Sequence, residues 1–503
     1  MELFNGGRAS LKNVPELLAG EFRARVIDAC NGEGRLVNLF GDRLDDGSVR
    51  LYAVIGFDEE ASLEVFSTRL PADSPRYESL AKDLVQAHAF EREIAEQWAV
   101  VPDGHPWPKP LRYHSNYRGA ADIWPDISRQ VIPGVYPFYA VGGDEVHEVG
   151  VGPVHAGIIE PGHFRFQCHG EEILHLEIQL GYQHRGIEPM LRGVDVQRGA
   201  FLSEAIAGDT ALGHSTAFCE VVESLAGCVI PPRAQAIRAV ALELERLANH
   251  TGDLGAMGMD TGFLPTSAYF GRMRGDYLNF LLALTGNRFG KGLCRPGGVV
   301  FDIEPAMADD FCRKLKQCRR EFEDVSELLF SRPSVLARFE GVGVLSMDDA
   351  KKFGVVGPAA RASHLERDVR INYASGMWQF HHIPLSVSAT GDVHARALVK
   401  KQEALRSLDF LLKVLPTLPK GGIFVPPGPM QPGMLALSLV EGWRGEIMHA
   451  GITDDRGVFT RYKVKDPSFH NWHALALAMR GGEISDFPLC NKSFNLSYCG
   501  HDL

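Results

Sequence analysis

The cysteines of this chain are never spaced as a Cys-x-x-Cys pair, although the sequence contains nine of them. Zinc ribbons and ferredoxin-type clusters are typically held by such pairs, so the sequence predicts neither kind of centre. An odd number of cysteines in a chain of 503 residues also argues against a disulfide framework and favours a reducing cytoplasm. We expect most of these cysteines to be buried small hydrophobic side chains.

Long apolar runs and an excess of basic charge are also missing. The one stretch of twenty residues without a charge, Gly421–Val440, contains four prolines, which would break a spanning helix. We expect a buried loop there that leads into a short helix, so that any membrane contact comes through a partner. Residues 1–10 lack a signal-peptide pattern, which predicts a chain that is not exported. The net charge of −11 argues against nucleic acid as a partner.

The length and the composition, with 45% apolar and 23% charged residues, indicate a globular protein of two domains. Residues 1–110 are predicted to form a small α+β unit with a helix at about Tyr77–Trp98. Its predicted strands, rich in β-branched and aromatic residues, are Arg35–Phe40, Val49–Phe57 and Ser62–Thr68. Prolines after Val101 exclude a helix or central strand, and a loose connector, residues 111–150, follows.

The second domain, residues 151–503, is predicted to be mainly helical with a β-rich rim. It opens with a hairpin, in which His163–His169 and Ile173–Leu180 flank a short turn and the second strand alternates apolar and polar residues. The predicted long helices are Ala234–His250, Ala306–Phe330 and His394–Leu415. The expected fold class is therefore α+β, a small N-terminal α+β domain followed by a large, mainly α-helical one.

Titratable side chains are concentrated between Gly152 and Arg198. They are His155, Glu160, His163, His169, His175 and His184, with Arg165 and Arg185. Such density beside a hairpin could mark a metal site, a proton relay or a polar functional cleft. The alternative is that His175 and other outward side chains simply face solvent or a partner. Because no Cys, Asp or Glu stands at ligand spacing, the cleft is favoured over a metal site.

A second candidate segment, Ile206–Ser215, is punctuated by glycines and precedes a helical pattern. The N–H groups of a helix N-terminus there could favour an anion or a polar headgroup. The structural alternative is an ordinary loop. Gly286–Gly292 also contains glycines, but no strand precedes it and it does not match a phosphate loop.

Several motifs occur together in the order found in a known family. They are Gly152-Pro-Val-His155, Gly181-Tyr-Gln-His-Arg-Gly-Ile-Glu188, Arg295-Pro-Gly-Gly-Val299, Gly341-Val-Gly-Val-Leu-Ser346 and Gly357-Pro-Ala-Ala-Arg-Ala-Ser363. With them, residues 150–503 resemble the quinone-site subunit of respiratory complex I and its relative, the large subunit of membrane-bound nickel–iron hydrogenases.

The N-terminal unit is similar to the smaller complex I subunit that docks beside the quinone-site subunit. Phe90-Glu-Arg-Glu93 followed by Gly104-His-Pro106 carries this likeness. The two are fused here, as in the formate hydrogenlyase branch, and Glu160-Pro-Gly-His-Phe-Arg-Phe166 and His214-Ser-Thr-Ala-Phe-Cys219 also resemble that branch. The resemblance therefore implies an N-terminal docking domain.

The chain departs from the hydrogenase pattern at the metal ligands. Hydrogenases of this family hold nickel with two Cys-x-x-Cys pairs, and the matching positions here are Ala207, Thr210, Ser497 and Gly500. Cys499 lies one place out of register. Because soft thiolates hold such a centre, we expect this chain to bind no metal and to lack hydrogenase activity. The sequence ends three residues after Gly500, so we also expect no cleavable tail.

The complex I pattern is incomplete as well, because the quinone-holding His and Tyr of the family align with Ile159 and Gly208. The residues that we predict to be catalytic are His155, Glu160, His163, Asp209 and His214. His184 and Arg185 are predicted to bind the cofactor or acceptor. The resemblance gives Glu160 a proton-relay role, although Pro161 here separates it from the Gly-His that follows the glutamate directly in hydrogenases.

The resemblance implies a subunit of a membrane-associated, complex I-like oxidoreductase. Electrons from NADH or ferredoxin would reach quinone or a similar acceptor through iron–sulfur clusters on a small partner subunit, and this chain would bind no cofactor itself. Membrane-arm partners would couple the reaction to ion translocation, and the chain would lie peripherally at the cytoplasmic face of the cell membrane. Two alternatives stay open, a non-catalytic scaffold between the small subunit and the membrane arm, and a hydrogenase with altered ligands.

Overall fold

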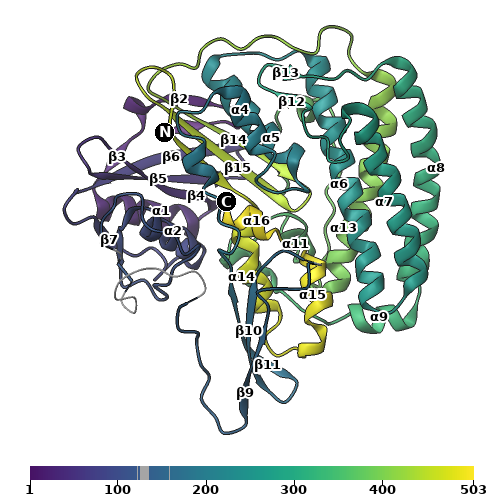
Figure 1. Ribbon diagram of the computed structural model, residues 1–503, viewed down its shortest axis with the longest axis horizontal. Coiled ribbons are helices and arrows are strands. Elements are labelled where there is room, and N and C mark those ends of the chain that lie inside the picture. The colour runs from purple at the N-terminus through teal and green to yellow at the C-terminus, as the bar shows by residue number, and fades with distance from the viewer. Residues whose placement is uncertain (122, 125–134, 158) are drawn as a thin grey trace.

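The structure is a computed structural model that describes residues 1–121, 123–124, 135–157 and 159–503. In Figure 1 the two largest sheets lie on the left of the molecule and the long helices on the right, with both chain ends on the side of these sheets. This mixed arrangement of separate sheets and helices confirms the α+β fold class.

The N-terminal unit is a five-stranded sheet with two helices packed on it. The order along the sheet is β1-β6-β5-β4, and β3 pairs in parallel with β6. The strands are β1 Glu2–Leu3, β3 Glu16–Leu17, β4 Gly34–Arg43, β5 Val49–Phe57 and β6 Ser62–Leu70. Helices α1 (Ala19–Asn31) and α2 (His88–Trp98) both contact β4 and share one apolar core with it. The three strands predicted from sequence are confirmed.

The helix predicted at Tyr77–Trp98 is wrong in its first half. Residues Arg76–Glu78 form strand β7, which pairs with β8 (Val101–Asp103), and α2 begins only at His88. The buried Glu91 carboxylate accepts hydrogen bonds from the N–H groups of Leu80 (2.7 Å) and Ala81 (3.1 Å). These bonds hold the preceding segment in a loop around α2, so tertiary contacts override its helical pattern.

A four-stranded antiparallel sheet unites the two ends of the chain. Its order is β16-β15-β14-β2, and its strands are β2 Arg8–Ser10, β14 Met434–Gly442, β15 Gly445–Thr453 and β16 Phe459–Lys465. Ala9 of β2 lies opposite Leu435 of β14, so the first residues of the chain complete a C-terminal sheet. The division into residues 1–110, 111–150 and 151–503 stays a prediction.

The buried loop and short helix expected at Gly421–Val440 are wrong. Residues 421–433 are mostly exposed or half-buried, and the chain then enters strand β14 rather than a helix. Leu437 and Ser438, which point to opposite faces of the strand, are both fully buried. A strand buried on both faces reads as a continuous apolar run, which periodicity cannot distinguish from a buried helix.

Four long helices form the bundle on the right of Figure 1. They are α6 Pro232–Asp260, α7 Leu264–Thr285, α8 Pro305–Phe330 and α13 Val393–Val414. The three predicted helices are confirmed, although α6 continues beyond His250 and α7 was not anticipated. The shorter α5 (Ala211–Ala226) packs across β14 and β15. Among the described residues, no helix is long and apolar enough to cross a bilayer.

The predicted hairpin is confirmed and carries a third strand. β10 (His163–His169) pairs with β11 (Glu172–Gln179), and β9 (Val146–Val151) pairs with the other edge of β10. The expectation of a loose connector up to residue 150 is therefore wrong at its end, while residues 122 and 125–134 of that connector lie outside the described residues.

The C-terminal helices lie between the hairpin and the bundle (Figure 1). They are α14 Ser468–Ala478, α15 Phe487–Phe494 and α16 Tyr498–Asp502. Helix α14 contacts β11 and α16, and α15 contacts α6 and α13. The remaining short helices are α3 Ile187–Met190, α4 Val196–Ser203, α9 Pro333–Phe339, α10 Met347–Lys352, α11 Gly357–Ala362 and α12 Val369–Asn372. Short strands β12 (Cys294–Arg295) and β13 (Gly298–Val299) pair with each other.

Candidate functional site

The four positions that match the hydrogenase cysteines meet at the starts of two helices. Thr210 is the N-cap of α5, and Ser497 is the N-cap of α16, where its hydroxyl accepts the N–H of Gly500 at 2.9 Å. Arg185 joins the two segments, because its guanidinium donates to the carbonyl oxygens of Ile206 (2.9 Å) and Cys499 (3.0 Å). Arg185 therefore lies between these two segments through contacts to backbone, and its predicted binding role stays a prediction.

Asp209 is held by an arginine that the sequence did not single out. Arg444 donates to both carboxylate oxygens of Asp209, at 2.6 and 2.7 Å, and to the hydroxyl of Thr210 at 3.1 Å. Burial alone would raise the pKa of Asp209, but Arg444 outweighs it and lowers that pKa. Asp209 is therefore a carboxylate fixed by a bidentate pair rather than a free proton donor.

Gly500 stands where backbone and side chains leave no room for a larger residue. A Cβ atom at this position would lie 2.7 Å from the Asp466 carboxyl group and 2.8 Å from the Ser497 hydroxyl oxygen. Asp466 is itself only 1% exposed, so it cannot simply swing into solvent. A cysteine at position 500 would need Asp466 to move, which means that the side-chain packing here suits glycine.

Glu160 lies beside the displaced cysteine. Its carboxylate accepts the N–H of Tyr498 at 3.3 Å, and burial followed by the charge of Glu160 raises the pKa of the Cys499 thiol to about 12. Cys499 therefore stays protonated at neutral pH, and its sulfur lies 3.5 Å from the Ser497 hydroxyl. Glu160 is half-buried, so it is placed to exchange protons between solvent and this cluster.

His155 and His163 bind the backbone of their own segment. The Nε2 atom of His155 donates to the carbonyl of Gly162 (2.8 Å), and Nδ1 of His163 donates to the carbonyl of Gly152 (3.1 Å). Burial lowers the pKa of His163. Among the described residues, no hydrogen bond or ion pair links either imidazole to Asp209, so the structure does not bring all the predicted catalytic residues together.

His184 packs behind α16 rather than against the four vacated positions. Its Nδ1 atom donates to the Asp502 carbonyl at 2.8 Å, and its ring stacks on His114 with centroids 4.5 Å apart. Burial and His114 lower the pKa of His184 to about 4, so it is neutral at physiological pH. This geometry holds the end of the chain in place, and the predicted binding role of His184 stays a prediction.

His214 is the centre of a buried chain of hydrogen bonds. Its Nε2 atom donates to Asp466 (3.0 Å), its Nδ1 atom lies 3.0 Å from Nε2 of His449, and Nδ1 of His449 lies 2.9 Å from the Tyr462 hydroxyl. Burial, with His214 adding to the effect, holds the pKa of His449 well below its usual range. If Tyr462 donates to the neutral His449, all three bonds point toward Asp466, an arrangement that can move a proton toward Gly500.

The vacated positions do not fit a nickel–iron centre. They offer a methyl group, two hydroxyls and a hydrogen atom in place of four thiolates, and the neighbouring Cys499 thiol is protonated. Within the described part of the chain, no group of three or more His, Cys, Asp or Glu side chains is arranged to hold a metal ion. The arrangement supports proton transfer at this site instead.

The sequence reasoning missed Arg444, His449, Tyr462 and Asp466. Each lies on or beside strands β15 and β16, more than 230 residues from the α5 segment that three of them contact. The only local signal was that His449 is a polar residue within an apolar, strand-forming stretch. Such a residue implies a buried partner but does not identify it.

The fold and the site are those of a large subunit of the kind found in hydrogenases and in complex I. The positions that hold nickel in hydrogenases have residues other than cysteine here. Formate hydrogenlyase subunit 5 of Escherichia coli (strain K12) is 32% identical over 489 residues, covering 92% of this chain and 84% of that protein. Hydrogenase-4 component G of the same organism is 29% identical, covering 93% and 83%. A subunit of the NADH-quinone oxidoreductase of Opitutus terrae is 28% identical, covering 68% and 87%.

The family described as respiratory-chain NADH dehydrogenase, 49 Kd subunit, matches residues 260–431. The chain belongs to this family of large subunits, shared by complex I-like and hydrogenase complexes, and the resemblance seen in the motifs is confirmed. It is a subunit of a membrane-associated, complex I-like oxidoreductase and works with partner subunits.

Proposed function

We propose that this chain carries the acceptor-reducing site of its complex and performs no hydrogen chemistry. Electrons from NADH or ferredoxin arrive through iron–sulfur clusters on a small partner subunit, and quinone or a similar acceptor binds beside the start of α16. Membrane-arm partners couple the reaction to ion translocation. The complex lies at the cytoplasmic face of the membrane.

One observation carries the proposal: titratable side chains joined by hydrogen bonds, rather than metal ligands, lie beside the vacated positions. Reduction of a quinone to a quinol takes up two electrons and two protons, so it needs proton donors close to the acceptor. Glu160 approaches the start of α16 from the hairpin side, where it contacts Tyr498. Asp466, linked to His214, fills the space that a side chain at Gly500 of the same helix would need.

In this proposal Glu160 delivers protons from solvent, because it is half-buried and next to Cys499. Asp466, His214 and His449 form a hydrogen-bonded chain along which a proton can shift in response to charge on the acceptor. Asp209 remains paired with Arg444, so it positions the α5 segment rather than titrating. Arg185 keeps the α5 and α16 segments together.

The test is to purify the complex from its native membrane and identify its subunits and bound quinones. Reduction of a soluble quinone is then measured with NADH and with reduced ferredoxin as donors, alongside hydrogen evolution and uptake. We expect donor-dependent quinone reduction and no hydrogen turnover. Hydrogen turnover by the pure complex would favour a hydrogenase with altered ligands, and an assembled complex that reduces no acceptor would favour a scaffold.

A further inference from the structure

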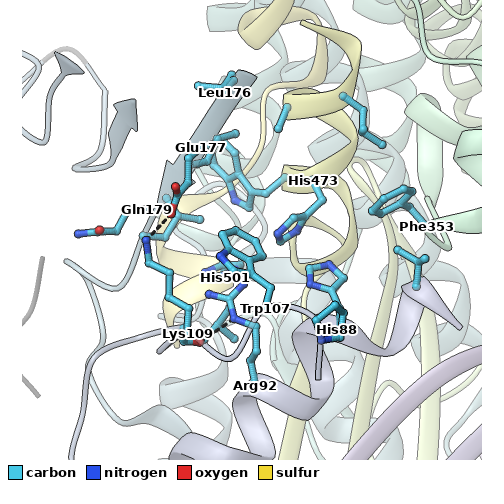
Figure 2. A pocket seen from close by; sticks show the side chains of 18 of the residues that line it. His88, Arg92, Trp107, Lys109, Leu176, Glu177, Gln179, Phe353, His473 and His501 are labelled. Atoms are coloured by element: carbon cyan, nitrogen blue, oxygen red, sulfur yellow. Dashed lines mark hydrogen bonds and ion pairs between the residues drawn. The ribbon is translucent and has the colours of Figure 1, made fainter. Parts of the chain in front are cut away.

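A cavity lies where the N-terminal unit meets the hairpin and α14 (Figure 2). Its volume is about 270 Å³, and it is lined by α2, the segment at residues 106–113, β11 and α14. Trp107, Phe353 and Trp472 supply large aromatic surfaces to its wall. We call it the α2–α14 cavity; the vacated metal-ligand positions are not among its lining residues.

Arg92 brings to this wall a positive charge that no ion pair holds among the described residues. Its side chain is buried, donates to the carbonyl oxygens of Lys109 (2.7 Å) and Pro110 (2.8 Å), and lies over the Trp107 ring, 4.4 Å from its centroid. Among the described residues, no carboxylate forms an ion pair with Arg92 and its Nη1 atom has no hydrogen-bond partner. A buried guanidinium without a carboxylate is costly, because burial removes its hydration.

The other buried charges of the cavity are already matched, and the remaining lining arginine, Arg480, is exposed to solvent. Lys109 forms an ion pair with Glu177, whose second oxygen accepts the N–H of Tyr139 at 2.8 Å. Glu96, the other carboxylate that influences Arg92, accepts the backbone N–H groups of residues 112 and 113. The charge of Arg92 is therefore available to a ligand.

Two neutral imidazoles lie against each other in the wall of the cavity, as Figure 2 shows. The rings of His88 and His473 lie edge to face with centroids 4.0 Å apart, and Nδ1 of His473 is buried without a hydrogen-bond partner. Burial lowers the pKa of His473 to about 3, and burial together with His473 holds the pKa of His88 well below its usual range. Tyr113, another lining residue, also has a buried hydroxyl with no partner among the described residues.

We propose that the α2–α14 cavity binds a small organic anion with a planar, apolar body, such as an aromatic carboxylate. Its negative charge pairs with Arg92, its ring lies against Trp107 and Trp472, and its remaining polar atoms meet His473 and Tyr113. The volume accommodates one fused-ring ligand, and aromatic walls with a few convergent polar groups are typical of small-molecule sites. This site is independent of the acceptor site proposed above.

The test is isothermal titration of the full-length chain with 2-naphthoate and with its neutral analogue, 2-naphthamide. We expect one 2-naphthoate per chain and binding of 2-naphthamide that is weaker by at least roughly tenfold, because only the carboxylate pairs with Arg92. Because the imidazoles of His88 and His473 are neutral, the affinity for 2-naphthoate should not change between about pH 6 and pH 8. Equal affinities for the two probes, or no binding of 2-naphthoate, would overturn the proposal.

Substitutions at Ala476 and Arg92, each with a matched control, test whether the probe binds in the cavity. Ala476→Phe fills the cavity from α14 and should weaken 2-naphthoate binding by at least roughly tenfold, whereas the matched control Ala337→Phe, exposed on α9, should leave it unchanged. Arg92→Met should remove the preference for 2-naphthoate over 2-naphthamide, while Arg92→Lys keeps it. Unchanged binding in Ala476→Phe would show that the probe binds elsewhere. Binding to the free chain but not to the native complex would show that a partner occupies the cavity.

Discussion

His214 and Asp466 form a hydrogen-bonded pair, 3.0 Å from nitrogen to oxygen, in which neither side chain has any solvent exposure. Burial alone would raise the pKa of Asp466, but His214 and Arg444 outweigh it and lower that pKa. The pair therefore stabilises the fold at neutral pH. This contribution is present above the unfolded pKa of about 3.9 and is lost as the pH falls through the lower folded value.

Removing the Asp466 carboxylate should destabilise the chain strongly. We expect Asp466→Leu to cost about 3–5 kcal/mol of unfolding free energy, because His214 is left with an unpaired buried N–H. Asp466→Asn keeps an acceptor and should cost roughly 1–2 kcal/mol. The exposed turn residue Asp455 supplies the control, Asp455→Leu. Urea unfolding measures all three, and a similar loss in Asp466→Leu and Asp455→Leu would contradict the buried pair.

Glu245 should make stability fall as the pH rises. It accepts the N–H groups of Leu212 (2.8 Å) and Gly213 (3.2 Å), and burial raises its pKa to about 8, with the backbone bonds opposing the shift. Since the unfolded pKa is about 4.3, the folded state holds the extra proton between these values, and stability falls by up to about 1.4 kcal/mol per pH unit. Glu245→Gln should remove this slope in urea unfolding measured from about pH 6 to pH 8. Parallel pH profiles for wild type and variant would disprove the shift.

The purified chain should contain no stoichiometric nickel, because Ala207, Thr210, Ser497 and Gly500 supply no thiolate. Gly500→Cys alone should bind no nickel and should cost about 1–3 kcal/mol of stability, since its Cβ would meet Asp466. Ser497→Cys is the control with little steric change. Elemental analysis and thermal unfolding measure the two effects. About one nickel per wild-type chain would refute this reading.

Limited proteolysis should cut the isolated chain between residues 114 and 150 rather than in the preceding segment. Lys109 and Arg112 are buried there and bind Glu177 and Glu93, which protects the backbone around them. The fragments should stay together after cleavage, because Lys463 of β16 pairs with Glu93 of α2 at 2.6 Å. Size-exclusion chromatography of the nicked chain tests this. First cuts within α6 or α8 would contradict the predicted boundary.

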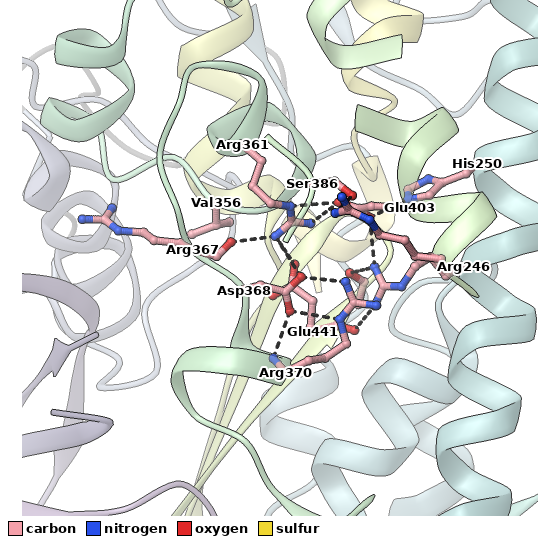
Figure 3. A network of polar contacts seen from close by, with 12 residues as sticks. Arg246, His250, Val356, Arg361, Arg367, Asp368, Arg370, Ser386, Glu403 and Glu441 are labelled. Atoms are coloured by element: carbon pink, nitrogen blue, oxygen red, sulfur yellow. Dashed lines mark hydrogen bonds and ion pairs between the residues drawn. The ribbon is translucent and has the colours of Figure 1, made fainter. Parts of the chain in front are cut away.

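A second buried network links the helix bundle to the C-terminal sheet. A substitution in this network should therefore loosen both elements together. Arg361 donates to Glu403 and Glu441, both at 2.8 Å, while Arg246 donates to backbone carbonyls of β14 (Figure 3). Burial raises the pKa of Glu441 to about 7, with Asp368 adding to the effect. Arg361→Met should therefore loosen both elements together, and hydrogen exchange that rises in α13 but not in β14 would contradict this coupling.

The sequence was most informative where local pattern decides structure. Strand β5 has the predicted bounds, and the residues Phe311, Leu315 and Phe322 of α8 are buried as their spacing implies. The two segments carrying the vacated ligand positions also meet, as the resemblance implies. By contrast, the predicted helix begins too early in the sequence. The Glu91 carboxylate binds the backbone of residues 80 and 81 and holds this segment in a loop before α2.

The partners within the site could not be predicted, because they depend on contacts between distant parts of the chain. Arg444 reaches Asp209 across 235 residues, and Asp466 reaches His214 across 252. Neither position belongs to a motif with a known spacing. The α2–α14 cavity could not be predicted for the same reason. Arg92 and His473 come from opposite ends of the sequence and line one cavity only because α14 packs beside the N-terminal unit.

Substitutions of the predicted catalytic residues should lower the rate of acceptor reduction to different extents, because the contacts of these residues differ. Asp209→Asn should change the rate of acceptor reduction less than Glu160→Gln, because Arg444 already holds the Asp209 carboxylate. His155→Ala should also lower the rate. The His155 ring donates to the carbonyl of Gly162, two residues after Glu160, and so helps to place the Glu160 carboxylate. Steady-state rates of the assembled complexes rank the three variants, and a larger loss in Asp209→Asn than in Glu160→Gln would reverse this order.

The rate of acceptor reduction in a fully assembled Glu160→Gln complex tests the central claim most directly. Glutamine keeps the size of the side chain and its contact with the Tyr498 N–H but cannot deliver a proton. We expect a fall of roughly 10²–10⁴-fold, as for loss of a positioned proton donor, with Glu171→Gln at the exposed hairpin turn as the control that stays at the wild-type rate. A wild-type rate in the assembled Glu160→Gln complex would contradict the proposed proton-delivery site.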